Sequence, residues 1–216
     1  MTPDSAPINL THHFLIAMPG LEDMAFSRSV VYLCEHTQRG ALGLIINKPT
    51  DITLGELFDK VELTLGREDL RQAPVLLGGP LQTERGFVLH EPMRAQQMGS
   101  AVEAEEPSEN ADSAPAEESG YASTMQIPGS GLEMTTSRDV LEALSTGAGP
   151  RKVLVTLGYA SWGEGQLESE LGENAWLTVQ ADPAVLFDTP VEQRYDRALS
   201  LLGLQAWMLS PEAGHA

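Results

Sequence analysis

The chain has 216 residues, of which 42% are hydrophobic and 20% charged, proportions typical of a folded globular protein rather than a disordered one. Thirteen Lys and Arg face 31 Asp and Glu, so the formal net charge is -18. A field of this sign repels phosphate backbones and anionic lipid, which disfavours direct binding to nucleic acid or to a membrane surface. The single cysteine, Cys34, excludes an internal disulfide and a multi-cysteine metal site.

The sequence shows no targeting or membrane signal. Residues 1–10 have neither the cationic start nor the apolar centre of a signal peptide. The longest apolar runs, such as Val30–Cys34, are too short to cross a bilayer. A lone thiol also suits a reducing compartment. We therefore expect a cytoplasmic protein without a membrane anchor.

The N-terminal half is predicted to be mostly β-structure. After a strand over residues 12–18, two apolar runs, Ser29–His36 and Ala41–Asn47, are separated by four residues that end in Gly40, a pattern typical of a β-hairpin. Neither run alternates with polar residues, so we expect both faces of these strands to be covered.

A helix and two further strands are expected next. Thr53 and Glu56 have the spacing of a capping box, which predicts a short helix directly after Thr53. Strands are predicted over Val75–Leu77 and Gly86–His90. Between them the run Gly78-Gly79-Pro80 predicts a loop.

An acidic segment then divides the chain. Residues 99–124 hold seven acidic residues, no Lys or Arg and many small residues, so we expect a flexible insertion within a single domain that spans residues 1–216. A partner-binding role is one interpretation of this segment; a tolerated surface insertion is the other. Outside it, 24 acidic residues still outnumber 13 basic ones.

The C-terminal half mixes strands and helices. Strands are predicted over Leu132–Thr135, Lys152–Leu157 and Trp176–Val179. Helices are predicted around Val140–Leu144, over Gln166–Asn174, and from a Thr189 cap through Leu202. Roughly eight strands and four helices indicate an α+β fold, with the helices packed on a mixed sheet.

Cys34 and His36 are the first candidates for catalysis. Residues two apart on a strand point to the same face, so a thiol and an imidazole could meet there as nucleophile and base. The alternative is that Cys34 is a buried core residue, which its apolar neighbours favour. The Gly-rich loop Tyr159–Glu168 is a second catalytic candidate, but its sequence lacks the G-x-S-x-G pattern of a serine hydrolase.

Metal and cofactor sites are not indicated. The five histidines have no HxxxH, HxH or carboxylate-paired spacing, so we expect no metal site and no cofactor.

The scarce basic residues suggest a binding site for a small anionic ligand. Lys48, Arg85, Trp162 and Gln166 all follow or flank predicted strands, and their loops could share one edge of the sheet. In that case the cations would contact the anion and the indole would form an apolar wall. The alternative is that the cations form structural ion pairs and the tryptophan packs in the core.

Three long blocks resemble the YqgE/AlgH family. They are His12–Pro49 (HHFLIAMPGLEDMAFSRSVVYLCEHTQRGALGLIINKP), Leu76–His90 (LLGGPLQTERGFVLH) and Leu157–Leu177 (LGYASWGEGQLESELGENAWL). The resemblance implies an α+β fold with a compact, β-rich, barrel-like core. It implies no catalytic residue, because the biochemical function of the family is not established and some members are described as transcriptional regulators.

We therefore hold three functional hypotheses. The first is a non-enzymatic binding or regulatory protein whose partner is a protein or a small anion. The second is an enzyme that uses Cys34 with His36, or the Tyr159–Glu168 loop. The third is a transcriptional regulator that acts on DNA, which the net charge disfavours.

Overall fold

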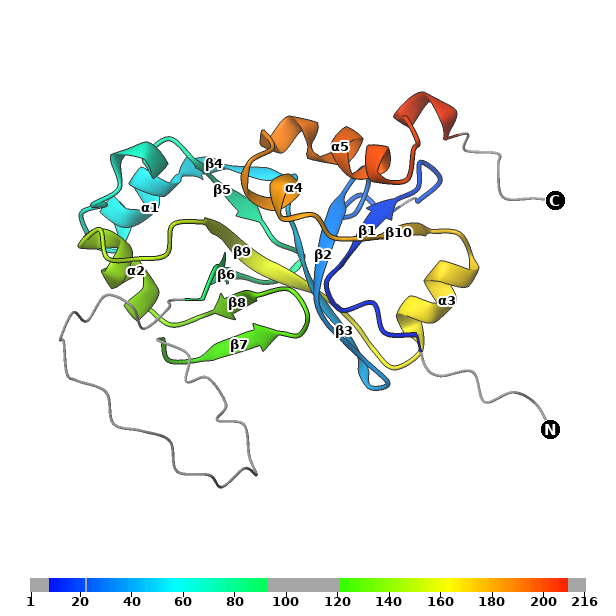
Figure 1. Ribbon diagram of the computed structural model, residues 1–216, viewed down its shortest axis with the longest axis horizontal. Helices are drawn as coiled ribbons and strands as arrows, with labels where there is room; N and C mark the ends of the chain where they lie inside the picture. Colours follow the sequence, from blue (N-terminus) through cyan, green and yellow to red (C-terminus); the bar gives the residue numbers. More distant parts are fainter. Residues whose placement is uncertain (1–7, 22, 93–120, 210–216) are drawn as a thin grey trace, which may run out of the picture.

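The computed structural model describes residues 8–21, 23–92 and 121–209 (Figure 1). The strands are β1 (His13–Ala17), β2 (Val30–Thr37), β3 (Gly40–Ile45), β4 (Pro49–Thr53), β5 (Pro74–Leu77), β6 (Leu81–His90), β7 (Thr124–Ile127), β8 (Leu132–Thr135), β9 (Val153–Trp162) and β10 (Trp176–Gln180). The α-helices are α1 (Leu54–Lys60), α2 (Asp139–Ser145), α3 (Gln166–Gly172), α4 (Pro183–Phe187) and α5 (Arg194–Leu201). Short 3₁₀ turns are η1 (Glu68–Leu70), η2 (Val191–Gln193) and η3 (Ala206–Met208).

All ten strands belong to one curled sheet. Its main path runs β10-β1-β2-β3-β9-β6-β8-β7, and β5 joins β4 to β9 beside this path. Every pairing is antiparallel except that of β5 with β9, where Leu76 lies beside Thr156. The long strand β9 connects the two ends of the sheet, because its first residues pair with β6 and its last residues with β3.

Helices cover both faces of this sheet. On one face, α4 and α5 pack on an inner core that draws side chains from β1–β3 and from β5–β9. On the other face, α3 covers the end formed by β1–β3 and β10, and α1 and α2 cover the end formed by β5, β6 and β9 (Figure 1). The expectation of an α+β fold with a barrel-like core and packed helices is confirmed.

The strongest local predictions are confirmed. β2 and β3 form the predicted hairpin, with Val31 opposite Ile45. The capping box is present, since the Thr53 hydroxyl accepts from the Glu56 N–H and a Glu56 carboxylate oxygen accepts from the Thr53 N–H. Both elements depend on contacts within a few residues, which is why the pattern alone identified them.

The segment after Leu157 differs from its predicted form. Residues 158–162 were expected in a loop but continue β9, where Ala160 and Trp162 are buried beside β3. Gly79, in the loop before β6, allows the backbone to approach this part of β9 closely: a Cβ on Gly79, whose φ is +158°, would lie 2.1 Å from the carbonyl carbon of Tyr159.

The short elements β4, β7 and α4 were not predicted, because each has only four or five residues and depends on tertiary pairing.

The acidic insertion falls mainly outside the described residues. Of the predicted range 99–124, only residues 121–124 are described. Tyr121 is buried against α2, and Thr124 begins β7. The folded chain therefore includes residues 121–124, which were assigned to the insertion.

Candidate functional site

The candidate Cys34–His36 pair does not form, and the alternative, a buried Cys34, is what the structure shows. β2 has a bulge at this point, so that Leu33 pairs with Gly43 and Glu35 with Leu42 while Cys34 is left without a partner. The extra residue shifts the alternation of side chains by one. Cys34 consequently packs in the inner core under α5, whereas His36 lies on the opposite face. Cys34 is fully buried, and burial raises the pKa of its thiol far above the ordinary value.

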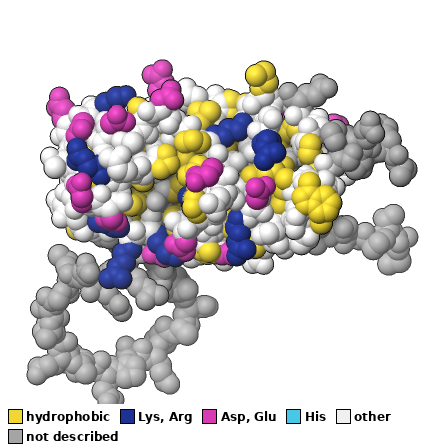
Figure 2. Space-filling view, turned by 90° about the horizontal axis from the view of Figure 1, so that it is seen from above, with side chains coloured by type: hydrophobic (Ala, Val, Ile, Leu, Met, Phe, Trp, Pro, Cys, Tyr) yellow, Lys and Arg dark blue, Asp and Glu magenta, His cyan; other side chains and the backbone are white. Residues whose placement is uncertain are grey.

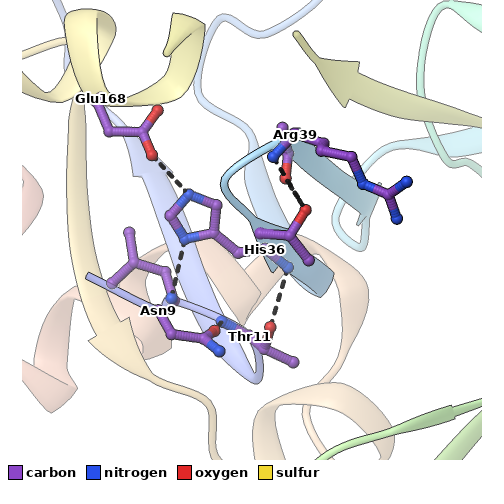
Figure 3. Close-up of polar contacts among 8 residues, drawn as sticks. Asn9, Thr11, His36, Arg39 and Glu168 are labelled. Atoms are coloured by element: carbon purple, nitrogen blue, oxygen red, sulfur yellow. Dashed lines mark hydrogen bonds and ion pairs between the residues drawn. The ribbon is translucent and has the colours of Figure 1, made fainter. Parts of the chain in front are cut away.

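His36 is held by bonds to both ring nitrogens (Figure 3). The Leu10 N–H donates to Nδ1 at 3.0 Å, so Nε2 carries the proton and donates to Glu168 Oε1 at 2.9 Å. The His36 backbone N–H also donates to the Thr11 hydroxyl. Because both ring nitrogens are already hydrogen-bonded, neither is free to accept a proton from a substrate. The imidazole instead links β2 to α3 and to the segment before β1.

Trp162 and Gln166 contact the same carboxylate. The indole Nε1–H of Trp162 donates to Glu170 Oε2 at 2.9 Å, and Trp176 donates to the same oxygen at 2.7 Å. Gln166 donates to Glu170 Oε1 and accepts from the Gly163 N–H. Trp162 is also packed against the rings of Trp176 and Phe26. These contacts hold the start of α3 on the sheet.

Lys48 and Arg85 lie elsewhere. Trp162 pairs with Ala41 at the beginning of β3, whereas Lys48 follows the far end of that strand. The four residue steps from Ala41 to Ile45 along β3 already span about 13 Å, and Lys48 follows three residues after the end of this strand. The Lys48 ammonium donates to the Ala25 carbonyl at 2.7 Å, and the Arg85 guanidinium donates to the Thr136 hydroxyl at 2.9 Å. The structure therefore does not bring Lys48, Arg85, Trp162 and Gln166 to one cleft.

A different part of the molecule contains a cavity next to a buried cation. A surface cavity of about 630 Å³, here called the outer cavity, opens between the first residues of β4 and β5 and the turn from α4 to α5. Pro49 and Pro74 form one side, and Phe187, Pro190 and Arg194 belong to the other. This volume lies within the range of small-molecule sites. One of the predicted loops does contribute, since Asn47 and Pro49 flank Lys48.

Arg194 is placed in this cavity by the start of α5. The residue is buried, with a relative exposure of 7%. Nη1 donates to the Ile46 carbonyl at 2.6 Å and Nε donates to the Thr189 carbonyl at 3.1 Å. The next residue, Tyr195, donates from its hydroxyl to the Ala17 carbonyl at 2.7 Å. Together these bonds connect α5 to β1 and to the end of β3, so the guanidinium is held in place.

The charge of Arg194 is not balanced by an acid in contact with it. In the described ranges, Arg194 forms no ion pair, and its two acceptors are both neutral carbonyls. Burial lowers the pKa of Arg194 to about 10, and the nearby charge of Glu192 partly opposes this effect. The group is still cationic at neutral pH. It is therefore a desolvated positive charge that lines a cavity.

Two acidic residues line the outer cavity as well. Asp188 accepts from the Lys152 ammonium at 3.4 Å, and Glu192 lies exposed on η2. Helices α4 and α5 lie at the top of Figure 1, and Figure 2 shows the molecule from above, looking onto this side. On this face apolar side chains reach the surface between scattered basic and acidic ones. Apolar residues, one cation and two acids thus line the outer cavity together.

Arg194 was missed in the sequence, although a signal was present. Tyr195, Ala198, Leu199 and Leu202 define the apolar stripe of the predicted helix, and Arg194 lies four residues before Ala198 on the same stripe. A charged residue on a buried helix face is uncommon. The pattern could not reveal the carbonyls that would contact it, because Ile46 is 148 residues away.

The described part of the chain contains neither a group of metal-ligating side chains nor a membrane-spanning helix. There, no three His, Cys, Asp or Glu side chains lie close enough together to hold a metal ion. No helix within the described ranges is both long and apolar enough to cross a bilayer.

The chain is similar to known proteins in both its sequence and its fold. A profile described as AlgH-like matches residues 14–207. A UPF0301 protein of Paracidovorax citrulli is 74% identical, and one of Variovorax paradoxus is 72% identical, each over the full length of both chains. The solution structure of the AlgH protein from Pseudomonas aeruginosa is similar over the full length of both chains, with 42% identity and a TM-score of 0.67. A crystal structure of a Corynebacterium diphtheriae protein shares the fold at 18% identity, with a TM-score of 0.62 over 92% of this chain and 93% of that one.

Proposed function

The chain belongs to the AlgH-like family, and from the geometry of its outer cavity we propose that it is a non-enzymatic binding protein, or a regulatory protein controlled by such binding. Its ligand is a small anion that pairs with Arg194. The observation that carries this proposal is Arg194 itself, a residue with a relative exposure of 7% that lines the cavity and has no acidic contact within the described residues.

The energetics of a buried cation support this assignment. Taking a charge out of water costs several kcal/mol unless a partner compensates it. Two carbonyl bonds offset part of that cost for Arg194. They use two of the five guanidinium N–H groups, and no described residue accepts a hydrogen bond from the other three. A planar guanidinium with free donors is suited to carboxylate or phosphate oxygens.

The two catalytic hypotheses receive less support. A thiolate at Cys34 is disfavoured by complete burial, and His36 lies on the other face of the sheet with both ring nitrogens bonded. In the Tyr159–Glu168 segment, the first residues are part of β9 and the polar side chains converge on Glu170. Neither place joins a nucleophile, a base and a cavity.

Calorimetric titration of the purified protein with monocarboxylates and with inorganic phosphate tests the proposal. We expect saturable binding of at least one of these anions and at least a tenfold loss of affinity in Arg194→Gln. Arg197→Gln is the matched control, because Arg197 lies on the same helix, is exposed and does not line the cavity. Its affinity should equal that of the wild type.

A second variant protects the test against misfolding. If circular dichroism shows that Arg194→Gln is unfolded, Arg194→Lys retains the charge but loses the planar fork, and we expect it to bind the same anion more weakly. The proposal is overturned if no anion binds the wild-type protein, or if a folded Arg194 variant binds with unchanged affinity.

A further inference from the structure

We infer that the anion bound by Arg194 is a monocarboxylate with an apolar tail of about six carbon atoms. This inference rests on the proposed function and adds the chemical class of its ligand. It follows from a second, inner cavity that adjoins the outer one and from the charges around Arg194.

The inner cavity is apolar and shares its boundary with the outer cavity. It has a volume of about 140 Å³ and lies between α1, η1, β5, the start of β9 and the end of α4. Pro74, Phe187, Val191 and Arg194 line both cavities. Apart from Arg194, every residue that lines the inner cavity is apolar. A ligand whose charged end contacts Arg194 can therefore extend an apolar group inward.

The size of the inner cavity sets the length of that group. An engineered protein cavity of roughly 150 Å³ with an apolar lining stays dry and binds benzene. The inner cavity here is nearly the same size and, apart from Arg194, is lined by apolar residues that include Leu54, Leu76 and Leu186. It therefore accepts about six carbon atoms, as in a short alkyl chain or a phenyl ring. A longer tail would have to leave the cavity.

The surrounding charges select a head group with one negative charge. Arg194 supplies a single positive charge, and the described residues that line the outer cavity include two acids, Asp188 and Glu192, but no other base. Lys152 neutralises Asp188 through its ion pair, whereas Glu192 is exposed on η2 and forms no ion pair with any described residue. Glu192 repels any anion, but it repels a phosphate dianion about twice as strongly as a carboxylate, and Arg194 compensates only half of the dianion's charge. A carboxylate matches the single guanidinium.

Titration with a series of ligands tests this class. The series is acetate, hexanoate and decanoate, with hexanamide as the uncharged analogue and hexyl phosphate as the dianionic one at pH 8. Each buried methylene group strengthens binding about fourfold, so hexanoate should bind on the order of a hundredfold more tightly than acetate. Decanoate should gain little over hexanoate, and hexanamide and hexyl phosphate should bind at least tenfold more weakly than hexanoate.

A variant that fills the inner cavity tests the contribution of the ligand's apolar tail separately from that of its carboxylate. Ala73→Leu adds three carbon atoms to a residue that lines only the inner cavity. We expect this variant to lose most of the advantage of hexanoate over acetate, so that the ratio of the two affinities falls toward one. If Ala73→Leu is unstable, Val153→Phe fills the same cavity from β9 and serves the same purpose.

The outcomes distinguish this inference from the proposed function. Equal affinities for acetate and hexanoate, or tight hexanoate binding in a folded Ala73→Leu protein, would overturn the assignment of the tail while leaving anion binding intact. Tighter binding of hexyl phosphate than of hexanoate would overturn the choice of head group. Absence of binding by every anion would overturn the proposed function as well.

Discussion

Removal of the Glu170 carboxylate tests whether Trp162 and Gln166 are structural. Glu170 is partly exposed on α3, yet its Oε2 is the acceptor for two indole N–H groups, at 2.9 Å from Trp162 and 2.7 Å from Trp176. Both tryptophans are nearly fully buried, with relative exposures of 3% and 4%. Glu170→Ala would leave two buried donors without an acceptor.

The expected loss of stability follows from those two donors. A buried donor that loses its partner costs about 1–3 kcal/mol, and bonds to a charged acceptor lie toward the upper part of this range. Because water reaches Glu170, part of the cost is recovered, and we expect a loss of about 2–4 kcal/mol. For a chain of this size that corresponds to a decrease in Tm of roughly 5–15 °C.

Urea unfolding followed by tryptophan fluorescence measures this loss. Glu170→Gln retains one acceptor oxygen, so its free energy of unfolding should lie between those of the wild type and Glu170→Ala. Glu164→Ala is the matched control, because Glu164 is an exposed acid just before α3 with no hydrogen bond or ion pair to a described residue. If Glu170→Ala lost less than about 1 kcal/mol, the carboxylate would not hold the two indoles, and a ligand-binding role for Trp162 and Gln166 would again be open.

Two further predictions concern buried titratable groups. Burial lowers the pKa of His90 despite the opposing charges of Glu133 and Asp139, so the unfolded chain takes up a proton at this position at a higher pH than the folded chain. The free energy of unfolding should therefore decrease as the pH falls below about 6.5. When urea unfolding is compared at pH 7.5 and 5.5, this decrease should be smaller in His90→Gln than in the wild type. An equal pH dependence in both proteins would refute the assignment to His90. Because burial raises the pKa of the Cys34 thiol, a thiol-reactive dye should label the native protein far more slowly than the urea-unfolded protein, and rapid labelling of the native protein would show that Cys34 is accessible.

Local rules were enough to predict several elements of this fold. The β2–β3 hairpin follows from two apolar runs separated by four residues, and α1 follows from the spacing of Thr53 and Glu56. The burial of Cys34 follows from its position after four apolar residues. In each case the interacting groups are close together in the sequence, so the local order of apolar, polar and glycine residues is enough to predict the element.

The position of each candidate site residue depended on longer contacts. The bulge at Cys34 is a property of the pairing between β2 and β3, and it separates Cys34 from His36 although their spacing suggested a shared face. The continuation of β9 depends on its pairing with β3, which turned a predicted loop into a strand with Trp162 buried at its end. Alternation and glycine content could not reveal either outcome, since neither describes the neighbouring strand.

The sequence by itself determined the fold class, the hairpin, the capped helix and an acidic surface charge. Only the tertiary structure decided where a ligand could bind. Arg194 becomes a candidate because folding places it beside the Ile46 carbonyl and the edges of β4 and β5, and no acid contacts it within the described residues. The physical reason is that desolvation and charge compensation are set by neighbours in space, and for this arginine those neighbours are far away in the sequence.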